Sequence, residues 1–214
     1  MKKIVNSARV PVYRDSGFDL SDAATAAAAF ENEYSHPHEP DKYIYSRYRN
    51  PTVVSAEQDI MNIERCKWAL LTQSGMSAID TALSLFQKGK ETRPWLFFNE
   101  IYGGTISFVE NILKGRRGID AHYFNPRGAK YDLDEFEKTV ATLKPEVVYA
   151  ETVSNPMVMV ADIEGIAKIT AKHGARLIVD NTFATPLLFR PLDSGADLVI
   201  HSATAGSHRT DQAV

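Results

Sequence analysis

Three polar residues near the C-terminal end of the sequence, Asp180, Ser202 and Thr204, come just after apolar segments. The aspartate closes the segment 176–180, RLIVD, and the Ser-x-Thr pair follows the segment 196–200, ADLVI. An ionised carboxylate keeps a pyridine nitrogen protonated and so makes the ring an electron sink, while hydroxyl groups bind phosphate. A pocket for pyridoxal 5′-phosphate (PLP) needs this combination near the lysine that carries the cofactor as a Schiff base. Taken singly, Asp180 fits a turn cap equally well, and both hydroxyls fit ordinary turns.

The position at which that lysine is expected holds a different residue. The lysine should come immediately after Thr204, but Ala205 stands there. None of the other lysines follows a predicted strand at a corresponding place. Removing a positioned general base costs roughly 10²–10⁴ in rate, and here the covalent anchor is lost as well. The sequence therefore predicts little or no turnover by this chain.

A second group of candidates lies in the segment Gln73–Met76, where an apolar segment gives way to an amphipathic one. Backbone N–H groups at the start of a helix attract phosphate, and glycine lets phosphate approach the backbone closely. Gly75 and Met76 are therefore candidate phosphate donors, although any strand-to-helix turn can contain glycine. Because the sequence has neither a dinucleotide fingerprint nor a P-loop lysine, a nucleotide-binding α/β domain ranks far below a PLP site.

Tyr102 and Asn155 follow two further apolar segments. A tyrosine ring beyond a strand end can stack on a flat cofactor, and its hydroxyl can exchange a proton with a leaving group. The alternative for Tyr102 is a surface turn. Asn155-Pro156, shortly after Glu151, is first of all typical of a turn.

Tyr45 and Arg47 in the N-terminal segment offer two more phosphate donors. Arginine presents a bidentate fork to phosphate, and tyrosine adds a hydroxyl. The alternative is a solvated basic strip. The segment His36–Glu39 contains a His-x-His pair without a second cluster, so we expect no metal site.

The elements that must position these residues alternate along the chain from about residue 54. Alternating strands and helices indicate a mainly parallel sheet with helices on both faces, in which ligands lie beyond the carboxyl ends of the strands. The candidate residues cluster at those ends. We predict helices at 54–66, 75–86, 105–113, 132–143 and 162–173, and strands at 68–72, 95–98, 121–124, 147–150, 177–179 and 198–200.

The length, composition and net charge are typical of a globular protein. It has 214 residues, 44% of them hydrophobic, and a formal charge of −3, which gives no reason to expect nucleic acid or a membrane as partner. The single cysteine, Cys66, cannot form an internal disulfide, which favours a cytoplasmic location. No signal peptide or membrane span is predicted. The first fifty residues lack strand–helix alternation and suggest an arm that wraps over a neighbour.

Together these segments resemble the PLP-dependent enzymes of Cys/Met metabolism, such as cystathionine γ-synthase, cystathionine γ-lyase, methionine γ-lyase and O-acetylhomoserine sulfhydrylase. The resemblance runs from about Tyr43 to Thr204. It rests on six motifs in family order: YSRYRNPT (45–52), SGMSAI (74–79), YGGT (102–105), ETVSNP (151–156), VDNTFATP (179–186) and HSAT (201–204).

The resemblance implies the large domain of a fold type I PLP-dependent transferase, at residues 54–204. It implies elimination or replacement at the γ (or β) carbon of sulfur amino acids or O-acylhomoserine. Residues 1–53 would form an arm that reaches a neighbouring subunit, so a homodimer or homotetramer is expected. The implied roles are as follows: Tyr45 and Arg47 hold the neighbour's cofactor phosphate, Gly75, Met76, Ser202 and Thr204 bind phosphate, Tyr102 stacks on the ring and assists proton transfer, Asn155 bonds the phenolic oxygen, and Asp180 pairs with the ring nitrogen.

Three departures from the family pattern stand out. Arg49 occupies a place where the family usually has glycine, which puts the local turn in question. Gly104 stands where dedicated methionine γ-lyases carry a cysteine, which makes that activity the less favoured one. Ala205 replaces the lysine, and the tail 205–214 matches nothing in the family, as if the chain were truncated before the rest of the sheet and the C-terminal domain. The alternative to an enzyme is therefore a non-catalytic fragment that binds PLP weakly or pairs with an intact subunit.

Overall fold

The computed structural model describes residues 10–37, 40–89, 93–128 and 130–206. The chain divides into two compact units, Met1–Leu71 and Thr72–Val214, which we describe separately. The predicted division after residue 53 separates an arm that would reach a neighbouring subunit from the large domain. This division stays a prediction. The last eight residues of the predicted tail, 207–214, lie outside the described residues.

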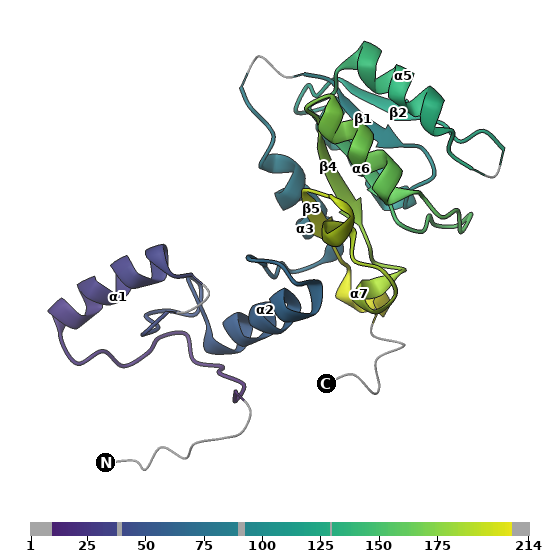
Figure 1. Ribbon diagram of the computed structural model, residues 1–214. Helices are drawn as coiled ribbons and strands as arrows, with labels where there is room; N and C mark the ends of the chain where they lie inside the picture. Colours follow the sequence, from purple (N-terminus) through teal and green to yellow (C-terminus); the bar gives the residue numbers. More distant parts are fainter. Residues whose placement is uncertain (1–9, 38–39, 90–92, 129, 207–214) are drawn as a thin grey trace. The chain divides into compact units, whose positions relative to one another are not determined.

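The second unit is built on a five-stranded sheet with the order β2-β1-β3-β4-β5 (Figure 1). Every pairing is parallel, so all carboxyl ends lie at one edge. The predicted sheet is thereby confirmed. The strands are β1 (Trp95–Phe98), β2 (Ala121–Phe124), β3 (Val147–Glu151), β4 (Arg176–Asp180) and β5 (Leu198–Ile200).

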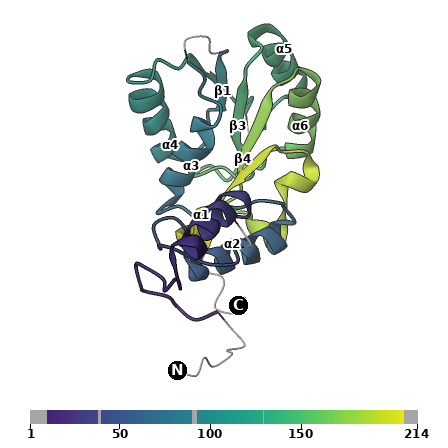
Figure 2. The same cartoon turned by 90° about the vertical axis from the view of Figure 1, so that its left-hand side faces the viewer.

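Helices cover both faces of this sheet. Figure 2 shows α3 and α4 on one side and α5 and α6 on the other. Strands β1 and β3 are buried along their whole length, because each has helices above and below it. The helical elements are α3 (Gly75–Ser84), α4 (Gly103–Phe108), the π-helix Val109–Lys114, α5 (Leu133–Leu143), α6 (Ile163–Lys172), α7 (Thr185–Leu188), the 3₁₀-helix Pro191–Ser194 and α8 (Ala203–Gly206).

Local sequence signals explain where the main helices begin. The Ser74 side chain accepts the N–H of Ser77 at the start of α3. The Asp132 side chain accepts two N–H groups at the start of α5. Serine and aspartate are both preferred residues at the N-cap of a helix. The predicted helix at 105–113 begins two residues earlier, as α4, and continues as a π-helix from Val109 to Lys114.

The prediction of a strand at 68–72 is wrong, since this segment has no regular structure. Its apolar residues suggested a strand, but the N–H of Leu71 donates to Oε1 of Glu57 at 3.0 Å. A side chain thus takes the backbone donor that a neighbouring strand would need.

The first unit holds two helices, α1 (Ala23–Ser35) and α2 (Pro51–Glu64). Asp22 caps α1 by accepting the N–H of Thr25. Asn50 caps α2, and Pro51 occupies the first helical position, where its missing N–H costs nothing.

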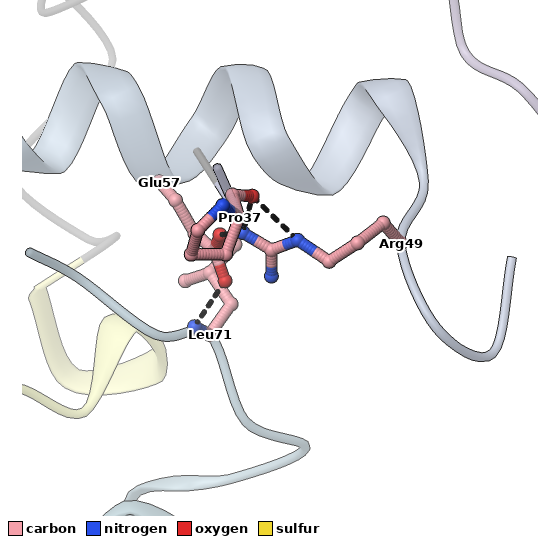
Figure 3. Close-up of polar contacts among 4 residues, drawn as sticks. All are labelled: Pro37, Arg49, Glu57 and Leu71. Atoms are coloured by element: carbon pink, nitrogen blue, oxygen red, sulfur yellow. Dashed lines mark hydrogen bonds and ion pairs between the residues drawn. The ribbon is translucent and has the colours of Figure 1, made fainter. Parts of the chain in front are cut away.

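A buried ion pair joins Arg49 to α2 (Figure 3). Nη2 of Arg49 lies 2.9 Å from Oε2 of Glu57, whose side chain is fully buried. The same guanidinium donates to the carbonyl oxygen of Pro37, while the other oxygen of Glu57 accepts from Leu71. The turn at residues 45–49, where the family usually has glycine at position 49, forms with arginine there. Its N–H groups of Tyr48 and Arg49 both donate to the Tyr45 carbonyl oxygen.

Replacement of Arg49 with methionine should destabilise this unit by about 3 kcal/mol, because it leaves the Glu57 carboxylate buried without its cation. Hydrogen exchange of the amides of α2 and Leu71 would measure the loss. The matched control is Arg14→Met on the exposed surface, which should change the opening free energy by less than about 0.5 kcal/mol. Equal effects of the two substitutions would show that the pair is not what holds this segment.

Candidate cofactor site

A cavity of about 360 Å³ opens at the carboxyl edge of the sheet in the second unit. It lies where polar residues follow β1, β3, β4 and β5, as expected of a parallel sheet. Seven predicted site residues line it. Its lining consists of Gln73, Ser74, Gly75, Met76, Ile79, Tyr102, Glu151, Val153, Asn155, Asp180, Thr182, Phe183, Ser202 and Thr204.

Asp180 ends β4 and is oriented by two neighbours. Its Oδ1 accepts the N–H of Thr182 at 2.9 Å, and its Oδ2 lies 3.3 Å from the hydroxyl of Tyr149. Tyr149 is fully buried in the core. Burial, followed by the negative charge of Asp180, raises the pKa of the Tyr149 phenol, which therefore remains a donor. The carboxylate is held ready to accept a further donor from the cavity.

The start of α3 meets the turn after β5, and both segments line the cavity. A Cβ atom at Gly75 would lie 2.7 Å from Cβ of Ser202, so only glycine allows the two segments to come this close. The Ser202 N–H donates to Oγ1 of Thr182, and its hydroxyl lies 3.0 Å from that of Thr204. The first N–H groups of α3 have no partner within the helix. Backbone and hydroxyl donors thus converge on one place, which suits a phosphate group.

Tyr102 precedes α4 and lines the cavity with a half-exposed side chain. Its ring lies against Gly104, where an added Cβ would come within 2.4 Å of ring atom Cε1. Gly104 therefore makes room for the tyrosine ring.

Asn155 lies in the turn that its sequence predicts, between β3 and α6, and it also lines the cavity. An isolated bridge between Val153 and Val160 closes the base of this turn. Asn155 can therefore be part of a turn and line the cavity at the same time.

Glu151 was expected at the carboxyl edge of the sheet, but sequence reasoning gave it no role in the site. It ends β3 opposite Asp180 in the register of the two strands, and it is only 7% exposed. Its Oε1 accepts the N–H of Tyr102 at 2.7 Å. Burial raises the pKa of Glu151 to about 7, the Tyr102 hydrogen bond opposes the rise, and the charge of Asp180 adds to it. A carboxylate directly after a buried strand was the available signal, the same one that singled out Asp180.

Tyr45 and Arg47 lie in the first unit. The guanidinium carbon of Arg47 lies 4.9 Å from the centre of the Tyr45 ring and 5.3 Å from that of Tyr48. Both Tyr45 and Arg47 are exposed to solvent in the single chain. Their predicted contact with a neighbouring subunit's cofactor stays a prediction, as do the individual roles of the cavity residues.

Among the described residues, no group of three His, Cys, Asp or Glu side chains is arranged to hold a metal ion. His38 and Glu39, which belong to the segment His36–Glu39 with its His-x-His pair, lie outside the described residues. No helix within the described ranges is long and apolar enough to cross a membrane.

The family model for Cys/Met metabolism PLP-dependent enzymes matches residues 1–206. The cystathionine gamma-synthase/O-acetylhomoserine (thiol)-lyase of Bacillus subtilis is 42% identical over 160 residues, which cover 75% of this chain and 40% of the relative. The L-methionine gamma-lyase of Pseudomonas putida is 36% identical over 197 residues, covering 91% of this chain and 45% of the relative.

Solved structures give the same result. A putative O-acetylhomoserine (thiol)-lyase from Campylobacter jejuni matches with a TM-score of 0.76 at 33% identity, over 92% of this chain and 45% of that one. That crystal structure carries N′-pyridoxyl-lysine-5′-monophosphate. The chain therefore spans less than half the length of the relatives it matches.

Proposed function

The chain belongs to the family of Cys/Met metabolism PLP-dependent enzymes, and we propose that its cavity binds PLP for elimination or replacement at the γ (or β) carbon of an amino acid. The substrate class is a sulfur amino acid or an O-acylhomoserine. Named relatives that include a cystathionine gamma-synthase and a methionine gamma-lyase support this assignment.

One observation carries the proposal: a single cavity is lined both by an oriented carboxylate and by converging backbone and hydroxyl donors. The approach of Gly75 to Ser202 leaves no room for a side chain and exposes backbone donors instead. The same cavity is lined by the oriented Asp180 and by apolar residues that include Phe183 and Ile79. A flat, phosphorylated heteroaromatic ring suits this combination of groups.

We assign the following roles to the residues of this chain. Asp180 holds the ring nitrogen and keeps it protonated, and Asn155 bonds the phenolic oxygen. Tyr102 stacks on the ring, and its hydroxyl gives a proton to the departing group. When bound, PLP supplies an electron sink for negative charge at the substrate's Cα. Phosphate donors are the backbone of Gly75 and Met76 and the hydroxyls of Ser202 and Thr204.

Tyr45 and Arg47 complete the phosphate site in the proposed assembly. Residues 1–53 would act as an arm that brings these two side chains to a neighbouring subunit, whose large domain corresponds to residues 54–204. The exposed pairing of Arg47 with the Tyr45 ring supports this role, because both groups face solvent. The assembly would then be at least a homodimer. We place it in the cytoplasm, because the single cysteine suits a reducing compartment.

The identity of residue 205 favours a second candidate function for the chain as it stands. With alanine in place of the lysine, the cavity would hold PLP without a covalent bond and would not turn over substrate. The first unit could still serve the site of an intact subunit.

Borohydride reduction with one equivalent of PLP separates these two functions. We expect calorimetry to show reversible PLP binding by the unaltered chain, and mass spectrometry to find no pyridoxyl group after reduction. The variant Ala205→Lys should gain one pyridoxyl group at position 205, and inorganic phosphate should compete with its formation. A stoichiometric pyridoxyl group on a native lysine would show that the chain is itself equipped for catalysis. Absence of PLP binding from both proteins would refute the proposed function.

A further inference from the structure

Glu151 is a buried acid in the cavity wall for which the proposed chemistry has no use. Its Oε1 accepts the Tyr102 N–H at 2.7 Å, and the backbone N–H of Asn155, four residues further on, also lowers the pKa of the carboxyl group. Tyr102 belongs to the loop after β1, and Asn155 to the loop after β3. The carboxyl group at the end of β3 therefore fastens the loop after β1 and interacts with the loop that follows it, and each loop supplies a cavity-lining side chain.

We propose that Glu151 is a positioning residue that sets Tyr102 and Asn155 against the bound cofactor through their backbone N–H groups. The inference rests on the proposed function, because it assigns Glu151 a part in placing the stacking ring and the amide partner. Glu151 holds both residues by the main chain, which leaves their side chains free to contact a ligand.

The strength of this attachment depends on the protonation of Glu151. An ionised carboxylate accepts N–H hydrogen bonds more strongly than a neutral carboxyl group does. Asp180 faces Glu151 from β4, Tyr149 lies on β3, and Tyr131 lies in the segment before α5. No described lysine, arginine or histidine forms an ion pair with Glu151. The pKa of about 7 means that the carboxyl group changes charge across neutral pH.

The variant Glu151→Gln keeps the size of the side chain and one acceptor oxygen but cannot ionise. We expect its PLP affinity to equal that of the unaltered chain at pH 6, where Glu151 is mostly neutral. At pH 8 the unaltered chain should bind about fivefold more tightly than the variant, because its ionised carboxylate holds both N–H groups. Comparing the two proteins at each pH cancels the titration of PLP itself. A ratio that stays constant between pH 6 and 8 would overturn the inference.

A double-mutant cycle tests whether Glu151 acts through the Tyr102 ring. Glu151→Ala should weaken PLP binding about tenfold, the size expected for a lost charge-assisted hydrogen bond. The same substitution in a Tyr102→Ala background should weaken binding less than threefold, because there is no ring left to position. A full tenfold loss in both backgrounds would mean a general structural role and would contradict the proposal.

The controls separate failure of this inference from failure of the proposed function. Glu164→Ala removes an exposed carboxylate from α6 and should leave the affinity unchanged. If the unaltered chain binds PLP and all Glu151 variants bind equally well, only the positioning role is wrong. If the unaltered chain does not bind PLP, the proposed function itself is wrong. Thermal unfolding of each variant confirms that the proteins compared are folded.

Discussion

Replacement of Asp180 with alanine should weaken binding of both PLP and pyridoxal by about 10- to 100-fold, the range of a lost charge-assisted hydrogen bond. The Asp180 carboxylate is the partner that we assign to the pyridine nitrogen. It is already oriented by Thr182 and Tyr149, so the cofactor does not have to arrange it on binding. Isothermal titration with each ligand would measure the change. The two ligands should lose affinity equally, because both contain the ring.

Two further variants sharpen this prediction. Asp180→Asn keeps the shape and hydrogen-bonding capacity but removes the charge, and it should lose nearly as much affinity as Asp180→Ala. The exposed Asp134 on α5 serves as a matched control, and Asp134→Ala should leave both affinities unchanged. Unchanged binding of the folded Asp180 variants would exclude pairing of this carboxylate with the ring.

Substitution of Gly75 with valine should abolish the preference for PLP over pyridoxal, with an expected loss of PLP affinity on the order of 100-fold. The new Cβ would lie 2.7 Å from Cβ and 2.9 Å from Oγ of Ser202. The turn after β5 must shift to relieve this overlap, at a cost of about 1–3 kcal/mol in stability. That shift separates the backbone donors of α3 from the hydroxyls of Ser202 and Thr204. Parallel titrations with PLP and pyridoxal would measure the effect.

Gly103 offers the matched control for this substitution. It lies at the start of α4, and a Cβ there would meet no heavy atom within 4 Å. Gly103→Ala should therefore preserve the selectivity for the phosphorylated ligand. If Gly75→Val binds PLP as tightly as the unaltered chain, the phosphate does not lie at the start of α3.

The sheet and its ligand edge could be predicted because local patterns determine them. Buried parallel strands have a continuous apolar signature, and the polar residues that end β3 and β4 are visible in the sequence itself. Because parallel strands share one carboxyl edge, residues as distant as Gly75 and Ser202 were expected to meet there, and they do.

The features of the fold and the site that could not be predicted depend on contacts between residues far apart in the sequence. The apolar segment 68–72 suggested a strand, but the Leu71 N–H is taken by Glu57, fourteen positions earlier in the chain. Glu151 received no role because its partner, the Tyr102 N–H, lies 49 residues away. The sequence left the turn at Arg49 in question, because the family usually has glycine there. The turn nevertheless forms, and the Arg49 side chain pairs with the buried carboxylate of Glu57 on α2.

A crystal structure of the chain grown with PLP would test most directly whether the cavity at the carboxyl edge is a cofactor site. The account predicts the pyridine nitrogen within hydrogen-bond distance of the Asp180 carboxylate. It predicts the phosphate between the first N–H groups of α3 and the hydroxyls of Ser202 and Thr204. A ring turned so that its nitrogen faces Ser202, or PLP bound elsewhere while this cavity stays empty, would contradict the account.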